Sequence, residues 1–194
     1  IKRALPQQIS FERFSRICMT AVRQNPKLQQ CNPMSFLGAL MQSAQLGLEP
    51  NTPLGQAYII PYGNEATFQI GYQGLLDLAY RTNQYKSIYA VAVYENDHFE
   101  YEEGLFRKLE HKPSMKPEGA PIYYYAVYHL INGGYGFAVM SRDEIINHRN
   151  KYSAAAKSGR SSPWDTDFDS MAKKTVLKQA LKYAPKSVEF GLAL

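Results

Sequence analysis

Apolar residues at helical spacing predict four main helices. In the first, the apolar positions recur every three or four residues, and Ser10 stands where an N-cap belongs. In the second, Asn32 can cap the helix, Pro33 suits the first helical position, and Gly47 can end it. A short fifth helix is predicted after Ser141, which can form a capping box with Glu144. The main helices are expected over residues 11–22, 33–46 and 75–82, and from the acidic stretch 165–169 to about residue 183.

Segments rich in β-branched and aromatic residues, separated by turn residues, predict antiparallel hairpins. The strongest hairpin signal is the turn Asn132-Gly133-Gly134. Residues 109–121 contain three prolines and are expected to be irregular. The predicted strands cover residues 57–61, 66–70, 87–94, 98–102, 122–130 and 135–140.

This mixture predicts an α+β fold, in which antiparallel β-hairpins and a small sheet pack with helices. The length of 194 residues suits one domain with a sizeable core. We therefore expect residues 1–194 to form a single domain. The function of this domain, a role in DNA binding and oligomerisation, and a further C-terminal region that binds partners and is missing from this sequence, are implied only by the family resemblance described below.

Charge is concentrated late in the chain. The net charge is +5, and residues 142–186 hold ten Lys and Arg against five Asp and Glu, whereas the other 149 residues hold twelve of each. A concentrated basic segment is expected of a protein that binds a polyanion. The alternative is a solvated helix face.

The basic segment combines cations with aromatic and hydroxyl residues. Lys174 and Lys178 repeat at a four-residue spacing with Lys182, so they share one helix face. Cations interleaved with aromatic rings suit single-stranded nucleic acid, whose bases can stack while its phosphates are neutralised. The alternatives are an ordinary amphipathic helix and, for the tryptophan, a core anchor. The candidate DNA-binding residues of this segment are Arg149, Lys151, Tyr152, Lys157, Arg160, Ser161, Trp164, Lys173, Lys174 and Lys178.

A second candidate contact lies where residues 66–70 lead into the third helix. Gly71 and Gly74 carry no side chain, so the backbone can approach a ligand closely. Gln69 and Tyr72 could then offer hydrogen bonds or stacking. The alternative is a tight turn that needs glycine for its dihedral angles alone.

Known catalytic patterns are absent from the sequence. No phosphate-binding loop, dinucleotide fingerprint or zinc-ligand spacing occurs. Asp165, Asp167 and Asp169 could form a metal-dependent nuclease site, although acids at a helix start more often serve as caps. The two cysteines make a disulfide framework improbable and favour a reducing cytoplasm, and no apolar run is long enough to predict a membrane span.

Several long motifs resemble the RecT family of phage single-strand annealing proteins. The resemblance spans nearly the whole chain, and the motifs occur in the same order as in the family. They are LGLEP at residues 46–50, GQAYIIPY at 55–62, FQIGYQGLLDLA at 68–79, SPW at 162–164 and DFDSMAKKTV at 167–176.

The resemblance implies that the protein binds single-stranded DNA and anneals complementary strands in phage recombination without hydrolysing ATP. It also implies a homo-oligomer, either a ring or a helical filament, that holds both single-stranded DNA and the annealed duplex. No cofactor is implied to be required, although Mg²⁺ would assist annealing. The implied partners are a phage exonuclease and the host single-strand-binding protein, both reached through missing regions, in the cytoplasm of the bacterial host.

Other functions stay open at this point. The basic helix could bind single-stranded or duplex nucleic acid, including RNA, without annealing it. The 15 tyrosines could serve the packing of a purely structural assembly, or simply fill half-buried strands. The apolar faces of the first two helices are expected to pack between subunits, with closure of the monomer core as the alternative.

Overall fold

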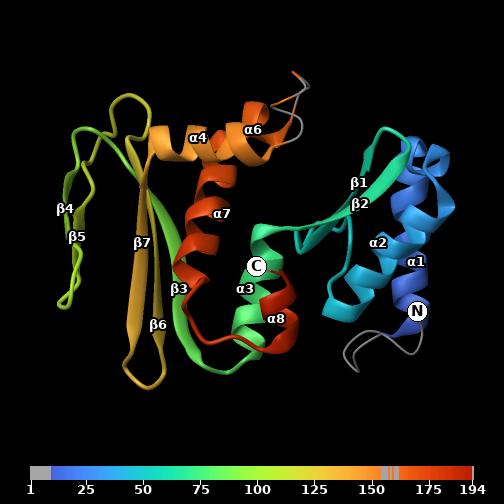
Figure 1. Ribbon diagram of the computed structural model, residues 1–194, viewed down its shortest axis with the longest axis horizontal. Helices are drawn as coiled ribbons and strands as arrows, with labels where there is room; N and C mark the ends of the chain where they lie inside the picture. The colour runs from blue at the N-terminus through green and yellow to red at the C-terminus, as the bar shows by residue number, and fades with distance from the viewer. Residues whose placement is uncertain (1–9, 154–156, 158, 160–161, 194) are drawn as a thin grey trace. The chain divides into compact units, whose positions relative to one another are not determined.

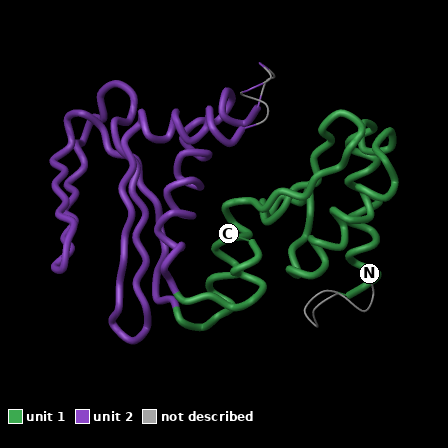
Figure 2. The backbone as a smooth tube through the Cα atoms, in the orientation of Figure 1, with its two compact units in different colours: residues 1–84, 185–194 green, residues 85–184 purple. Residues whose placement is uncertain are grey.

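The computed structural model describes residues 10–153, 157, 159 and 162–193. It confirms the α+β fold class. The chain divides into two compact units, residues 1–84 with 185–194, and residues 85–184 (Figure 2). The prediction of one DNA-binding domain over residues 1–194 stays a prediction.

The first unit begins with helices whose ends are set by local capping. In α1, Phe11–Gln24, the Ser10 hydroxyl accepts from the backbone N–H of Arg13 at 3.2 Å. After the 3₁₀ helix η2, Pro26–Gln30, the helix α2 covers Pro33–Leu46. Its cap Asn32 accepts from a backbone N–H, and Gly47 ends it in the left-handed conformation at φ 60°. The predicted starts of both helices and the predicted stop of α2 are therefore confirmed, whereas α1 extends two residues beyond its predicted end.

A hairpin of β1, Ala57–Tyr62, and β2, Glu65–Ile70, packs on these helices. The core that joins them includes Phe14 of α1, Leu40 of α2 and Ile59 of β1. The hairpin confirms the prediction made from its turn and flanking strands.

The helix α3, Tyr72–Arg81, begins three residues before the predicted start. Gly71 is its N-cap residue, so Gly74 lies inside the first turn instead of preceding the helix. A last helix, α8, Val188–Ala193, was not predicted from the sequence and belongs to the same unit. It packs against α3 and α2, with Phe190 fully buried.

The second unit is built on a three-stranded antiparallel sheet. Its order is β3, Tyr85–Val93, then β6, Tyr123–Leu130, then β7, Tyr135–Ser141. A separate hairpin pairs β4, His98–Glu102, with β5, Lys108–Lys112. The expectation that residues 109–121 are irregular is wrong for residues 109–112. These residues precede the first proline of the stretch, and the partner strand β4 satisfies their backbone groups.

Two different layers cover the two faces of this sheet (Figure 1). The β4–β5 hairpin covers part of one face, where Phe99 and Leu109 pack on Val93, Tyr125 and other outward residues of the strands. The helix α7, Phe168–Leu181, lies across the other face. Because side chains alternate along a strand, Tyr124 points to α7 while its neighbour Tyr125 points to the hairpin.

Two shorter helices complete the second unit. The helix α4, Arg142–Tyr152, starts with the predicted capping box of Ser141 and Glu144. The one-turn helix α6, Pro163–Thr166, precedes α7 and has its own capping box, formed by Ser162 and Asp165. In the described part of the chain, every helix is too short or too polar to cross a lipid bilayer.

Candidate nucleic-acid interface

The starts of α4 and α7 are fixed to the sheet by one buried joint. The Tyr124 hydroxyl donates to the Asp169 carboxylate, and the Arg142 guanidinium lies 4.5 Å from the centre of the Phe168 ring. The ring of Trp164 meets Phe168 edge-on at 5.7 Å. This joint holds the two basic helices in one orientation relative to each other.

Trp164 is 7% exposed. Its ring contributes to packing at the start of α7, as the core-anchor alternative states, and offers little area to a base. Its assignment to DNA binding stays a prediction that the burial does not favour.

The far end of α4 and the middle of α7 bring separate cations together. Burial lowers the pKa of His148, and the positive charges of Lys178 and Lys151 lower it further. Such an effect requires short distances, because an exposed charge acts only weakly beyond about 10 Å in physiological salt. Lys178 of α7 therefore lies within electrostatic range of His148 on α4. We call His148, Lys151, Tyr152, Lys174 and Lys178 the α4–α7 cationic surface.

Lys174 and Lys178 of α7 are only partly exposed to solvent. Burial and, to a smaller extent, the charge of Lys178 together lower the pKa of Lys174 from 10.5 to about 8. Burial also lowers the pKa of Lys178. In the described part of the chain, no acidic side chain forms an ion pair with Lys178. A partly desolvated ammonium group of this kind gains much from an anion, because it has already lost part of its hydration.

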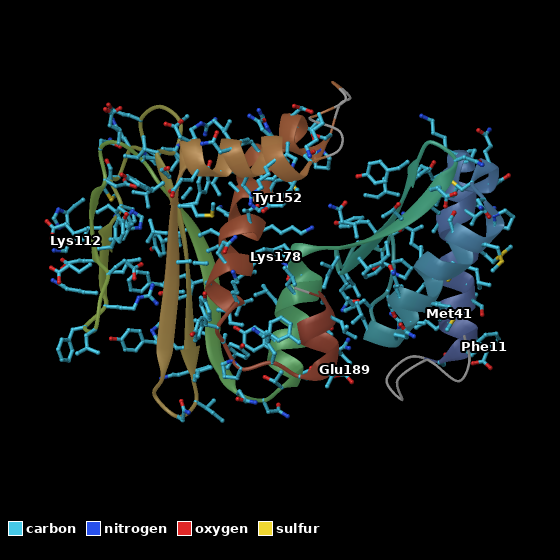
Figure 3. The ribbon with its side chains drawn as sticks, viewed as in Figure 1. Phe11, Met41, Lys112, Tyr152, Lys178 and Glu189 are labelled. Carbon is cyan, nitrogen blue, oxygen red and sulfur yellow. The ribbon has the colours of Figure 1, made fainter. Side chains whose placement is uncertain are left out.

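An exposed aromatic ring lies within the same surface. Tyr152 is 64% exposed, and its ring lies 4.7 Å from that of His148. The Lys151 ammonium is 5.2 Å from the centre of the Tyr152 ring. Figure 3 labels Tyr152 at the end of α4 and Lys178 on α7. A ring beside ammonium groups can stack on a base while the cations meet its phosphates.

The remaining candidates of the basic segment are distributed around this surface. Arg149 is partly exposed and donates to the side-chain oxygen of Asn150. Lys157 is exposed and Lys173 is partly exposed. Arg160 and Ser161 lie outside the described residues.

The glycine corner belongs to the first unit and serves packing. At Gly71 φ is −84°, an ordinary value, so the turn does not need glycine for its dihedral angles. A Cβ at Gly71 would lie 2.0 Å from the carbonyl oxygen of Gly55, and one at Gly74 would lie 2.1 Å from that of Gln56. The space left by the two glycines is therefore filled by the chain's own loop.

The other two residues of this corner are half-buried. Gln69 lies on β2, and Tyr72 begins α3. Burial raises the pKa of Tyr72. Their contact with DNA stays a prediction. The backbone that closely approaches the two glycines belongs to residues 55 and 56 of the chain itself, and not to a ligand.

The three local aspartates have separate structural partners. Asp165 accepts from the backbone and hydroxyl of Ser162, and Asp167 accepts from the backbone N–H of Ser170. Asp169 accepts from Tyr124. Within the described ranges, no cluster of His, Cys, Asp and Glu has the geometry of a metal site. These contacts favour the helix-capping interpretation over the nuclease.

His148 is the residue of this surface that the sequence interpretation missed. A signal was available, because His148 precedes Lys151 and Tyr152 by three and four residues and so shares their helix face. Its proximity to Lys178 depends on how α4 and α7 are both placed on the sheet, which no local pattern specifies.

A surface of partly buried lysines next to an exposed tyrosine is typical of nucleic-acid-binding proteins. The sequence profile of the RecT family matches residues 12–194. The chain is 40% identical to Protein RecT of Escherichia coli K12 over 199 residues, which cover 98% of this chain and 72% of that protein. It is 34% identical to the uncharacterized protein YqaK of Bacillus subtilis 168 over 182 residues, which cover 93% of this chain and 62% of that protein.

The chain therefore belongs to the RecT family. The resemblance inferred from the motifs is confirmed. Membership makes the chain a DNA-binding protein of recombination, in a family associated with strand annealing.

Proposed function

We propose that the protein binds single-stranded DNA along the α4–α7 cationic surface and anneals it to a complementary strand without ATP. The observation that carries this proposal is the proximity of Lys178 on α7 to His148 and Lys151 on α4, next to the exposed ring of Tyr152. Residues from two separate helices thereby form one cationic surface with a stacking group.

The physical basis is the repulsion between two DNA strands. Ammonium groups that neutralise the phosphates of one strand reduce its repulsion for a second strand. Contacts to the backbone and to the flat faces of the bases do not depend on sequence, so any pair of complements could be accepted. Base pairing supplies the driving force, and nucleotide hydrolysis is not needed.

We further propose the assembly and the partners that the family resemblance implies. Copies of the chain would form a ring or helical filament that carries single-stranded DNA and then the annealed duplex. Mg²⁺ would assist without being required, because it also screens phosphates. A phage exonuclease would supply the single strand in the bacterial cytoplasm, and regions outside this sequence would contact it and the host single-strand-binding protein.

An annealing assay tests the proposal. Two complementary oligonucleotides, one with a fluorophore and one with a quencher, should pair faster with the protein present and ATP absent. Lys178→Ala should slow this pairing, whereas Lys182→Ala, at the exposed C-terminal end of α7, should leave it nearly unchanged. Acceleration that requires ATP, or equal effects of the two variants, would contradict the proposal.

A competition experiment separates annealing from general nucleic-acid binding. The protein, bound to labelled single-stranded DNA, is challenged with unlabelled single-stranded DNA, duplex DNA or RNA. Preference for preformed duplex or RNA, without faster pairing, would favour the alternative of a general binding module. Cleavage of the labelled strand in the presence of Mg²⁺ would instead favour the nuclease.

A further inference from the structure

A row of aromatic rings lies on the face of the three-stranded sheet that α7 does not cover. The β4–β5 hairpin packs on only part of this face, around Tyr125. Towards the β6–β7 turn, each strand contributes one ring: Tyr89 of β3, His129 of β6 and Tyr135 of β7. We call these three residues the aromatic strip.

The three rings are close neighbours with similar orientations. The centre of the His129 ring lies 6.4 Å from that of Tyr89, with 28° between the ring planes. It also lies 6.4 Å from that of Tyr135, with 38° between the planes. Tyr89 is 42% exposed and Tyr135 is 58% exposed. The strip therefore presents three neighbouring rings, of which Tyr89 and Tyr135 are exposed and His129 is partly exposed.

Hydrogen bonds hold the strip in place. The Ser87 hydroxyl lies 3.1 Å from Nδ1 of His129, and the Tyr135 hydroxyl donates to the carbonyl oxygen of Arg107 at 3.3 Å. Rings that are already oriented lose less side-chain freedom when a ligand stacks on them.

The charges around the strip do not oppose an anionic ligand. The three strands and the turn at residues 131–134 contain the exposed Lys86 and no aspartate or glutamate. An acidic side chain near the strip is that of Glu103, which pairs at 2.7 Å with Arg107, the residue whose carbonyl oxygen accepts from Tyr135. A ligand with flat rings and negative phosphates fits this combination.

We propose that the aromatic strip is a second binding site for single-stranded nucleic acid, at which unpaired bases stack on Tyr89, His129 and Tyr135. This inference rests on the proposed function for the class of its ligand. The site is distinct from the α4–α7 cationic surface, because α7 lies against the opposite face of the same sheet. The strip binds bases through ring faces, whereas the cationic surface depends mainly on phosphate contacts.

A purely structural role predicts a different outcome. Cross-strand ring pairs stabilise a sheet, so removal of one ring would lower the melting temperature and leave DNA affinity unchanged. The experiment therefore measures both quantities on each variant. It also uses a ligand that has phosphates but no bases.

Tyr89→Ala and Tyr135→Ala are compared with the wild type for binding to long oligo(dA) and to an abasic oligonucleotide of equal length. Each variant should bind oligo(dA) about fivefold or more weakly, the lower limit for loss of one stacked base. Binding of the abasic strand should be unchanged, because it has no bases to stack. Tyr135→Phe should keep the wild-type affinity, since it retains the ring. Tyr101→Ala is the matched control, because Tyr101 is also 42% exposed but lies between two glutamates on β4.

Three results would overturn the inference. The first is wild-type affinity of folded Tyr89→Ala and Tyr135→Ala for oligo(dA). The second is an equal loss of affinity for both ligands, and the third is a change in oligomer size alone. Threonine variants at both positions, which keep strand propensity, replace any alanine variant that fails to fold.

Lys178→Ala separates failure of this inference from failure of the proposed function. If it weakens the binding of both ligands while the ring variants change neither, only the aromatic strip is refuted. If the wild type binds neither ligand, the proposed function fails as well.

Discussion

The low pKa of Lys174 leads to a prediction about how DNA binding depends on pH. With a pKa of about 8, Lys174 is charged in roughly nine-tenths of the free protein molecules at pH 7 and in roughly one-tenth at pH 9. If the bound state requires the charged lysine, affinity for single-stranded DNA should fall about tenfold between these two pH values. A lysine with the ordinary pKa of 10.5 would stay charged and produce almost no change.

Two variants of Lys174 isolate this contribution. Lys174→Arg carries a guanidinium that stays charged throughout this range, so its affinity should fall much less than that of the wild type. A smaller fall should remain, because the pKa of Lys178 is also lowered. Lys174→Met has no charge to lose and should bind weakly at both pH values. Fluorescence anisotropy of a labelled oligo(dA) at constant salt measures these affinities.

Protein stability provides an independent check, since it should change in the opposite direction. Between the folded pKa of about 8 and the unfolded value near 10.5, the unfolded chain binds more protons at Lys174. The free energy of unfolding of the wild type should therefore rise relative to that of Lys174→Met as the pH increases through this range. Denaturant titrations at several pH values measure the difference.

Wild-type affinity that stays constant from pH 7 to pH 9 would refute a role for the charge of Lys174 in DNA binding. An equal loss of affinity in Lys174→Arg and in the wild type would refute it as well. Unfolding at high pH cannot imitate the expected result, because the predicted stability rises where the predicted affinity falls.

Three further predictions concern separate parts of the chain. Lys178→Ala should lower the slope of log affinity against log salt by roughly 0.7, the value for one phosphate of a single strand, whereas Lys182→Ala should keep the wild-type slope. Salt titrations that give the two variants equal slopes would contradict this prediction. Gly71→Ala should lower the free energy of unfolding by about 1–3 kcal/mol, because the new Cβ would clash with the carbonyl oxygen of Gly55. An unchanged melting temperature would show that the loop around Gly55 moves to accommodate the Cβ without loss of stability. Met34→Glu, at a position of α2 that is 71% exposed, should reduce the size of the oligomer in light scattering and leave a folded monomer by circular dichroism; unchanged oligomers would remove this position from the subunit contact.

The sequence specified most element boundaries because their causes are local. Ser10 and Asn32 cap the helices that follow them through bonds to N–H groups two or three residues away. The Asn132-Gly133-Gly134 turn likewise sets the hairpin of β6 and β7. These contacts span a few residues, so their patterns can be seen in the chain itself. The RecT motifs were visible for a similar reason, as continuous runs of residues.

The tertiary structure decided which residues meet and which are buried. The β5 strand exists because β4 pairs with it, and α8 is formed where Phe190 packs into the first unit. The glycines of the α3 corner looked like open space for a ligand, but the carbonyl groups of residues 55 and 56 occupy that space. In each case the deciding contact comes from a different segment of the chain.

The cationic surface shows the same division. Composition alone revealed that residues 142–186 carry the net positive charge. Only the tertiary placement of α4 and α7 brings His148 within range of Lys178, and burial is the main cause that lowers the pKa of Lys174 to about 8. Charge is a property of each residue and can be counted, whereas proximity and desolvation arise when distant segments pack together.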